Sequence, residues 1–553
     1  MRSLVLLAAL LSSLSLPAAQ RAVPADRFVD SVGINVHWSA NSYRSNWSTL
    51  KQKLGELGVR HQRDGAIAPA YPRARELFQD FGIKTLWITG RREAGPWPQR
   101  LVPEQAASEI AELRALTDCT IAIEGPNEYD IMRPQHETNW PGTLRRYHEA
   151  VYQAVRADPV FDGIPVVGPS LTSLQSYQRA GNYADIIDAT CLHHYQSTRH
   201  PGTTGWGDDG YGSIDWALRR LAAAQGPGKP GPWSTECGYN RELGAEVHPR
   251  YINRTSAEFF RSGYIRSFKY ELLGDEWGLL RGDLSETPAF TALKNLLNLL
   301  SDRGPEFEPS TLRYTLDGDL TDIRQLLLQK RDGRFYLILW QEVASWDPIK
   351  ERVITVAPRP IALHLGRRFA QAAAYEPMLS AEPHRTVDNA QQLNLMVNDH
   401  LLVIELTPTT APSPETASAK SKASKPAITI SPELDQVWAQ RLLQRTTTSL
   451  AQGRSARLEL SAMGGQIVVL ESLANDTIEV SLLGTRMRLP FDSLQASDRA
   501  SLAADLARRG QAEDHAIAAY HLLRIGNSNA ARDHLWNAGT EAAQLKELFA
   551  LAP

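Results

Sequence analysis

The chain has 553 residues, too many for a single compact core, so we expect two or three domains. Its 59 Lys and Arg residues nearly balance its 62 Asp and Glu residues, and the formal net charge of −3 argues against general binding to nucleic acid or anionic lipid. A hydrophobic content of 42% is ordinary for a globular domain.

Residues 1–20 have the pattern of a secretory signal peptide. A positively charged start precedes a short apolar run over residues 4–16, and small residues at 17–20 offer a cleavage site. The run is too short to span a bilayer comfortably, and no second long apolar run follows. We therefore expect a secreted protein, extracellular or periplasmic, with no membrane span. A buried amino-terminal helix fits this pattern less well, and the exact cleavage site stays open.

Eight short apolar runs alternate with eight amphipathic segments between about residue 28 and residue 300. The predicted strands are residues 31–38, 59–64, 83–90, 120–127, 165–170, 189–195, 231–236 and 265–273. The predicted helices are residues 47–57, 74–81, 104–116, 142–157, 183–187, 213–225, 249–262 and 290–301. This alternation predicts an α/β fold, a (β/α)8 TIM barrel over residues 21–304. The rival, a doubly wound open sheet, lacks its Gly-x-Gly-x-x-Gly signature after the first strand.

The remaining sequence predicts two further domains. Residues 305–408 are rich in strand patterns and turns, which indicates an antiparallel β-sandwich with strands at 322–328, 335–340, 352–357 and 400–406. Residues 409–427 read as a flexible linker. Residues 428–553 predict a small α+β domain whose partner and role are unknown, with a helical hairpin formed by residues 514–525 and 529–538 near its end.

Cysteine and histidine patterns suggest no cofactor. The three cysteines, Cys119, Cys191 and Cys237, fall in or beside apolar runs and are expected to be buried free thiols. No Cys/His spacing predicts a metal site. The neighbours His193 and His194 lie on one strand-like run, so one can enter the active site while the other packs against the outer helices.

Two glutamates end predicted strands and carry most of the functional signal. Glu128 closes the run Ile123-Glu-Gly-Pro-Asn-Glu128, and Glu236 closes Trp233-Ser-Thr-Glu236. Because the carboxyl ends of parallel barrel strands meet on one face, the two carboxyl groups should face each other there. Cleavage of a glycosidic bond uses such a pair: one group protonates the leaving oxygen, and the other attacks the sugar carbon or activates water.

At these two motifs the chain resembles the retaining glycoside hydrolases of clan A, and most of all family 39 and related small families. The resemblance covers the barrel and extends loosely to the sandwich. It implies that Glu128 is the acid/base and Glu236 the nucleophile, with the two carboxyl groups about 5–5.5 Å apart. It also implies that Asn127 bonds the sugar 2-hydroxyl and that Arg63, at the end of the second strand, keeps the nucleophile charged.

Other polar residues at strand ends have a substrate-binding and a structural interpretation. His37, His193 and Tyr195 occupy positions where the clan places polar groups around the catalytic subsite, although a structural histidine fits equally well. The carboxylates Glu124, Glu271 and Asp275 either anchor loops or touch substrate.

Aromatic residues at or after predicted strand ends suit a sugar cleft, because their faces pack against the C–H faces of pyranose rings. The set comprises Trp38, Trp87, Trp97, Trp206, Trp233, Tyr239 and Trp277. Among them Trp38, Trp233 and Trp277 are the predicted substrate-binding residues. Trp277 departs from the clan, which often has a tryptophan ending strand eight, whereas here the strand ends Tyr270-Glu-Leu-Leu-Gly274.

Two functional hypotheses follow. The first is a secreted retaining glycoside hydrolase acting on a polysaccharide or its oligomers. The second is a noncatalytic carbohydrate-binding or cell-envelope protein on a barrel scaffold, because a fold alone does not define activity. The presence of Asn127 together with both glutamates favours the enzyme. Inversion would require widely separated carboxyl groups, and the sequence names neither the sugar, the linkage, nor endo or exo action.

Overall fold

A computed structural model describes residues 18–409 and, with short gaps, residues 432–545. The chain divides into two compact units, Met1–Ser418 and Ala419–Pro553. The predicted signal segment falls almost entirely on residues 1–17, and the predicted linker falls on residues 410–427, apart from its first residue. Both predictions thus lie outside the described residues and stay predictions.

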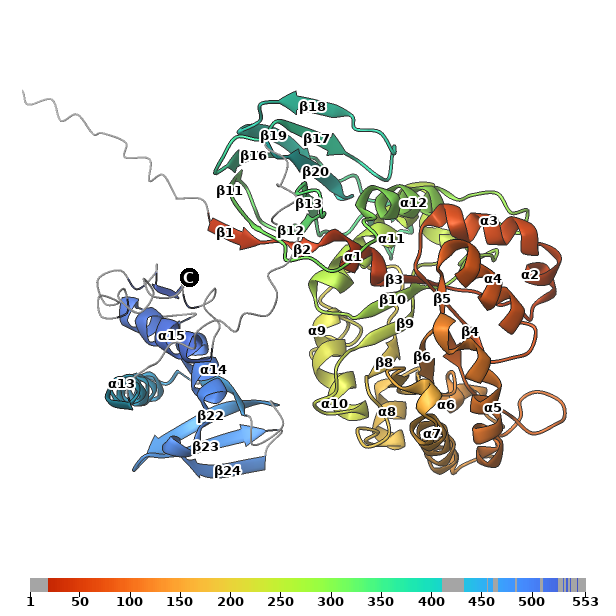
Figure 1. The fold of residues 1–553 in the computed structure, drawn as a ribbon, viewed down its shortest axis with the longest axis horizontal. Coiled ribbons are helices and arrows are strands. Elements are labelled where there is room, and N and C mark those ends of the chain that lie inside the picture. Colours follow the sequence, from red (N-terminus) through yellow and green to blue (C-terminus); the bar gives the residue numbers. More distant parts are fainter. Residues whose placement is uncertain are drawn as a thin grey trace, which may run out of the picture. The chain divides into compact units, whose positions relative to one another are not determined.

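Eight parallel strands form the centre of the first unit (Figure 1). In sheet order they are β7 (Val166–Val167), β6 (Thr120–Glu124), β5 (Lys84–Ile88), β4 (His61–Gly65), β3 (Val32–Asn35), β10 (Arg266–Lys269), β9 (Trp233–Cys237) and β8 (Cys191–His193). A parallel bridge between Val167 and Ala189 joins the two edges, so the sheet closes. The predicted (β/α)8 barrel is confirmed.

Helices surround this sheet because each buries one apolar stripe against it. The main ones are α3 (Trp47–Leu57), α4 (Tyr71–Phe81), α5 (Ala106–Glu112), α7 (Trp140–Ala157), α8 (Leu174–Ala180), α11 (Gly244–Arg261) and α12 (Pro288–Leu300). The sixth repeat is built from α9 (Ile214–Trp216), the π-helical turn η4 (Ala217–Leu221) and α10 (Ala222–Gln225). Shorter helices are α1 (Ala25–Asp30), α2 (Asn41–Ser45), η1 (Pro103–Gln105), η2 (Leu113–Cys119), α6 (Tyr129–Met132), η3 (Pro159–Phe161) and η5 (Arg241–Leu243).

Two glycines show how the repeats turn from helix to strand. Gly58 (φ 81°) and Gly82 (φ 66°) adopt the left-handed conformation that ends α3 and α4, and β4 and β5 follow within a few residues. The helix predicted at residues 183–187 is wrong, since that segment contains only turns and bends, and the fifth helix is α8, which precedes it.

The β-sandwich is also confirmed, and its two sheets share one apolar core. One sheet has the order β1 (Ala18–Arg21), β11 (Thr311–Gly318), β16 (Arg359–Leu365) and β19 (Gln392–Val397). The other has the order β18 (Arg385–Asp388), β17 (Gln371–Tyr375), β20 (Leu402–Thr407), β13 (Phe335–Gln341), β12 (Ile323–Gln329) and β2 (Val23–Pro24). The short pair β14 (Trp346–Asp347) and β15 (Arg352–Val353) lies apart from both. Strands β1 and β2 thus belong to the sandwich, although they precede the barrel strands in the sequence.

A buried carboxylate ties the sandwich to the barrel. Glu342, which follows β13, has a fully buried side chain that accepts bonds from the guanidinium of Arg254 in α11. It also accepts from His200 Nδ1 (2.7 Å) and the Gly202 backbone N–H (2.9 Å). Burial alone would raise the pKa of Glu342, but the Arg254 charge and the bond from His200 outweigh it and lower that pKa to about 2.

The second unit has its own apolar core. Its antiparallel sheet is formed by β21 (Ala456–Leu460), β22 (Gln466–Ala474), β23 (Thr477–Leu482) and β24 (Thr485–Pro490), and its helices are α13 (Pro432–Ala451), η8 (Phe491–Ser493), α14 (Ala496–Ala507) and α15 (Ala512–Arg524). The described helical hairpin pairs α15 with α14. The predicted partner helix at 529–538 falls mostly outside the described residues.

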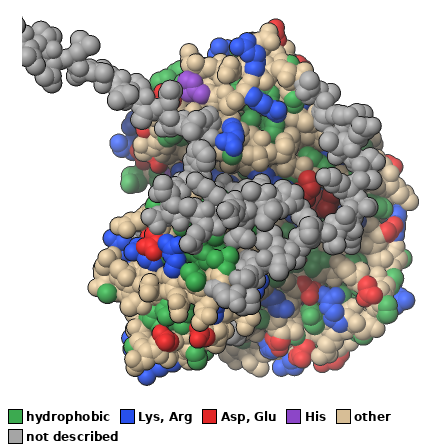
Figure 2. All heavy atoms as spheres, turned by 60° about the vertical axis from the view of Figure 1, so that its left-hand side comes forward, with side chains coloured by type: hydrophobic (Ala, Val, Ile, Leu, Met, Phe, Trp, Pro, Cys, Tyr) green, Lys and Arg blue, Asp and Glu red, His purple; other side chains and the backbone are tan. Residues whose placement is uncertain are grey.

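The described surface agrees with the balanced composition. On the face drawn in Figure 2, basic and acidic side chains are interspersed. Among the described residues, no helix is both long enough and apolar enough to cross a membrane.

Candidate active site

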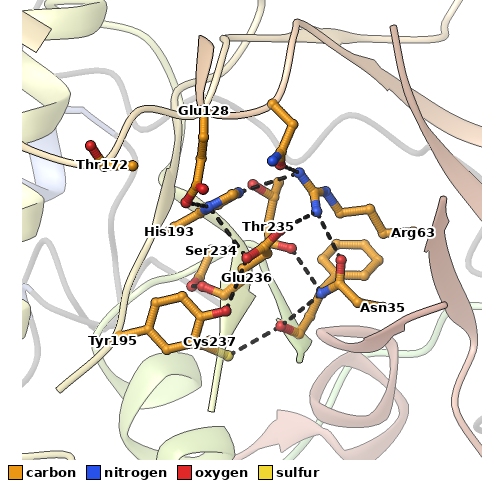
Figure 3. A network of polar contacts seen from close by, with 12 residues as sticks. Asn35, Arg63, Glu128, Thr172, His193, Tyr195, Ser234, Thr235, Glu236 and Cys237 are labelled. Atoms are coloured by element: carbon orange, nitrogen blue, oxygen red, sulfur yellow. Dashed lines mark hydrogen bonds and ion pairs between the residues drawn. The ribbon is translucent and has the colours of Figure 1, made fainter. Parts of the chain in front are cut away.

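The predicted residues Arg63, Glu128, His193, Tyr195 and Glu236 converge at the carboxyl-terminal ends of the barrel strands (Figure 3). Arg63 lies on β4, His193 ends β8, Glu236 lies near the end of β9, and Glu128 follows β6. In this fold the loops at that face build the active site. Parallel strand pairing explains why these side chains lie close together. Neighbouring strands place equivalent positions side by side, and His193 is in register with Glu236.

The two glutamate side chains point toward each other across His193 (Figure 3). A Glu128 carboxylate oxygen and a Glu236 carboxylate oxygen lie within 4.8 Å of one another. Nδ1 of His193 lies 2.7 Å from Glu128 Oε1 and 3.4 Å from Glu236 Oε2. An oxygen–oxygen separation of at most 4.8 Å places the two carboxyl groups closer together than the ~6.5–9.5 Å typical of inverting pairs.

The backbone at Glu128 aims its carboxylate into the cleft. Glu128 has φ 42° and ψ 42°, a left-handed conformation that costs a residue with a side chain about 1–3 kcal/mol. Its backbone N–H donates to Ser170 O (2.9 Å), and α6 begins at the next residue. Strain held in this way marks the turn from β6 to α6 as a functional segment.

Arg63 organises the opposite side of the cleft. Its Nε and Nη2 donate to the two oxygens of Glu124 (2.6 and 3.0 Å), a carboxylate with no exposed surface. Its Nη1 donates to Glu236 Oε1 (2.8 Å), the contact that the sequence predicts. Burial alone would lower the pKa of Arg63, but the charges of Glu124 and Glu236 outweigh it and raise that pKa. A permanent positive charge therefore lies beside Glu236.

Asn35, at the end of β3, completes the support of Arg63, although the sequence did not single it out. Its Oδ1 accepts from Arg63 Nη1 (2.8 Å), and its Nδ2 donates to the backbone oxygen of Thr235 (3.1 Å). The sequence signal that could have identified Asn35 is its polar side chain within the apolar run of the first strand. Glu124 likewise serves as an anchor for Arg63, with Thr235 Oγ1 as a further donor (2.9 Å).

The contacts of His193 define its tautomer. Arg63 Nη2 lies 3.3 Å from His193 Nε2, and a guanidinium can only donate. We therefore assign the ring proton to Nδ1, from which it donates to Glu128. His194 points the other way, with its ring stacked on Phe259 of α11, which agrees with the division of roles predicted for the pair.

Asn127 and Tyr195 also face the site. Asn127 Oδ1 accepts from Arg63 Nη2 (2.7 Å), and within the described part of the chain its amide nitrogen has only a long contact, with Met132 Sδ (3.7 Å). The Tyr195 hydroxyl donates to Glu236 Oε2 (2.9 Å). Burial and the nearby Glu236 raise the pKa of Tyr195 well above its usual value, so the hydroxyl remains a donor.

An aromatic wall lies beside Glu236. The Trp277 ring packs edge-on against Tyr195, with centroids 5.3 Å apart, although it follows strand eight by several residues. His37 lies at the end of β3 and forms an ion pair with Glu271 (3.2 Å). Burial would lower the pKa of His37, but the Glu271 carboxylate outweighs it and raises that pKa.

Two predicted substrate residues do not reach the cleft. Trp38 is fully buried, with Nε1 donating to Gln62 Oε1 (2.9 Å) and its ring against Trp47. Trp233 is 5% exposed and packs in the barrel interior, because it begins β9 and so lies at the amino-terminal end. Both predictions are corrected: these rings fill the protein core. The other aromatic candidates divide into buried Trp87 and Tyr239, half-buried Trp206, and Trp97, which is 61% exposed.

Glu128, His193 and Glu236 each have one ligand atom within 4.8 Å of the others, which is close enough for the three to bind one metal ion. Arg63 argues against a dication there. Its Nη1 is 2.8 Å from Glu236 and its Nη2 is 3.3 Å from His193, so a cationic group already occupies this side of both ligands.

Comparisons with known proteins return structural neighbours only. No protein-family model and no curated protein matches the chain. A GH30 endoxylanase from Clostridium papyrosolvens C71 is similar over 71% of this chain and 98% of its own, at 11% identity and a TM-score of 0.43. Gas2 of Saccharomyces cerevisiae, in complex with laminaritriose and laminaritetraose, is similar over 49% of this chain and 65% of its own, at 16% identity and a TM-score of 0.36. At these identities and TM-scores the likeness adds no argument about family or activity.

Proposed function

We propose that the protein is a retaining glycoside hydrolase that cleaves O-glycosidic bonds of a polysaccharide or oligosaccharide. The observation that carries this proposal is the pair of facing carboxylates, Glu128 and Glu236, with oxygens within 4.8 Å. The charge of Arg63 lies beside only one of them, so the two groups have different environments. Different environments suit different roles, one acid and one nucleophile.

In the first step Glu236 attacks the anomeric carbon while Glu128 protonates the departing oxygen. Arg63 and the Tyr195 hydroxyl each bond one oxygen of Glu236, which orients the carboxylate for attack. The products of this step are the released leaving group and a glycosyl ester on Glu236. Asn127, whose amide nitrogen lacks a close partner among the described residues, is placed to bond the sugar 2-hydroxyl.

In the second step Glu128, now ionised, removes a proton from water, and the water oxygen attacks the anomeric carbon of the glycosyl ester. The bond from that carbon to Glu236 breaks, which frees the Glu236 carboxylate. His193 donates to Glu128 from Nδ1 and so stabilises the ionised form that this step needs. The leaving-group proton and the water proton thus pass through the same carboxylate, and configuration at the anomeric carbon is retained.

Residues 1–20 support secretion as part of the proposal, because their pattern is that of a signal peptide. The alternative is a noncatalytic carbohydrate-binding or cell-envelope protein. The strained conformation of Glu128 favours the enzyme, because a binding scaffold has no evident use for that cost.

A substrate screen with three variants tests the proposal. The purified protein is assayed on a panel of polysaccharides and aryl glycosides, and Glu236→Gln should remove nearly all turnover. Glu128→Gln should lose about 10²–10⁴-fold on substrates with poor leaving groups and far less on activated aryl glycosides, where azide should restore rate. Glu242→Gln, at an exposed glutamate after β9, is the matched control and should retain full activity. Oligosaccharide binding without wild-type turnover on any substrate would favour the noncatalytic alternative.

A further inference from the structure

An exposed tryptophan, Trp97, lies on the loop that follows β5. Trp97 lies in a hairpin between β5 and α5, whose arms pair through Glu93 N and Arg100 O (2.9 Å) and through Val102 N and Arg91 O (3.0 Å). Its side chain is 61% exposed, the most exposed tryptophan among the described residues. Exposing a large apolar ring forgoes stabilisation from burial, so a held and exposed ring suggests a ligand.

The Trp97 ring is fixed from behind by a cation. The guanidinium of Arg92 lies 4.8 Å from the Trp97 ring centroid and 5.3 Å from the centroid of Tyr129. Arg92 Nη1 also donates to the backbone oxygens of Gln99 (2.8 Å) and Met132 (3.1 Å). One face of the Trp97 indole is therefore covered by a charged group held on both sides, and its remaining surface is open.

The same contacts tie the Trp97 hairpin to α6, the helix that follows Glu128 directly. Tyr129, whose ring also contacts the Arg92 guanidinium, follows Glu128 directly. Its hydroxyl accepts from Leu101 N (3.2 Å) at the base of the hairpin. Met132, whose backbone oxygen accepts from Arg92, ends α6, and Glu128 is the N-cap residue of that helix. Trp97 and Arg92 thus belong to the side of the site that carries Glu128. Tyr195 and Trp277 lie on the side of Glu236.

We propose that Trp97, backed by Arg92, is an aglycone subsite that stacks a pyranose ring of the leaving group. The proposal rests on the proposed function, in which Glu128 protonates the oxygen joining the cleaved sugar to that leaving group. An open indole face matches the apolar C–H face of a pyranose. The substrate class is accordingly an oligosaccharide or polysaccharide with sugar units on both sides of the cleaved bond.

Substrates with and without a sugar ring in the leaving group test this subsite. Cellohexaose, xylohexaose and laminarihexaose are compared with glucosyl and xylosyl fluorides, whose leaving group has no ring to stack. On the hexasaccharide that the wild type cleaves, Trp97→Ala should lower kcat/KM about 10- to 100-fold, as loss of one good contact does. The fluoride of the same sugar should be turned over at the wild-type rate. Trp97→Phe should recover most of the loss, since it keeps an aromatic face.

Ile349→Ala, which removes a 90% exposed apolar side chain from the sandwich, is the matched control and should match the wild type on both substrates. An equal loss on hexasaccharide and fluoride in Trp97→Ala, or no loss on either, would overturn the subsite while leaving the proposed function standing. A wild-type protein that turns over neither these substrates nor any member of the polysaccharide and aryl-glycoside panel would overturn the proposed function, and the subsite with it.

Discussion

At the residue scale, the site depends on one fully buried guanidinium. Arg63 binds the oxygens of Glu124, one oxygen of Glu236 and the side-chain oxygen of Asn127, and its own side chain is 1% exposed. Such a network is stable only while its charges are balanced, because a carboxylate without solvent or partner is costly to bury. The proposed catalytic pair and the stability of the barrel therefore depend on the same residue.

Replacement of Arg63 should consequently cost stability as well as activity. Arg63→Gln leaves Glu124 buried without its cation, and we expect a loss of about 3–5 kcal/mol in the free energy of unfolding, measured by urea denaturation. Arg219→Gln is the control, because its pair with Asp215 is mostly exposed and should contribute nothing measurable. Equal stability of Arg63→Gln and the wild type would show that Glu124 does not depend on this partner.

The sequence predicted the charged residues of the site better than the aromatic ones. Glu128, Glu236 and Arg63 meet because strand ends converge in a parallel barrel, which depends only on their place in the repeat. Trp38 and Trp233 do not reach the site. A ring near a strand can face solvent, the helices or the barrel interior, and tertiary packing decides which of these surroundings it has. Their burial could not be read from strand patterns.

At the scale of elements, the sequence predicted best where local signals agreed with packing. The helix at residues 47–57 matches α3, whose apolar stripe ends at a glycine suited to the left-handed cap. The helix predicted at residues 183–187 is absent. Tyr183, Ile186 and Ile187 are buried there, but the segment that carries them forms turns and bends. The fifth helix instead starts after Ser173, whose hydroxyl accepts from Ser176 N.

The contact between α11 and the end of β13 yields a pH-dependent prediction. Glu342→Gln removes the charge partner of Arg254, which is fully buried, and should cost about 3–5 kcal/mol near neutral pH. The folded-state pKa of Glu342 is lowered to about 2 from 4.5, so its contribution is present above pH 4.5 and is lost as pH falls toward 2. The difference in unfolding free energy between the variant and the wild type should therefore shrink between pH 6 and pH 3.

Glu382→Gln, at an exposed glutamate between β17 and β18, is the control and should track the wild type at both pH values. A gap between Glu342→Gln and the wild type that stays constant from pH 6 to pH 3 would contradict the assigned direction of the pKa shift.

At the scale of the whole molecule, the chain holds two units with separate apolar cores. Deletion of residues 409–553 should therefore leave a folded barrel and sandwich with full activity, because each unit buries its own core. Circular dichroism, thermal melting and turnover of the shortened chain check this expectation. Loss of soluble expression would show that the second unit is needed to fold the first.

The central claim is that a glycosyl group becomes covalently attached to Glu236 during turnover. A 2-deoxy-2-fluoroglycosyl fluoride forms such an adduct but hydrolyses it slowly, because fluorine at C2 disfavours the positive charge of both transition states. The protein is incubated with fluorides of the sugars that it cleaves, digested, and analysed by mass spectrometry. The mechanism predicts one labelled peptide, modified at Glu236, and no label in Glu236→Gln. A label on another residue, or turnover of the parent substrate with inverted configuration and no adduct, would contradict it.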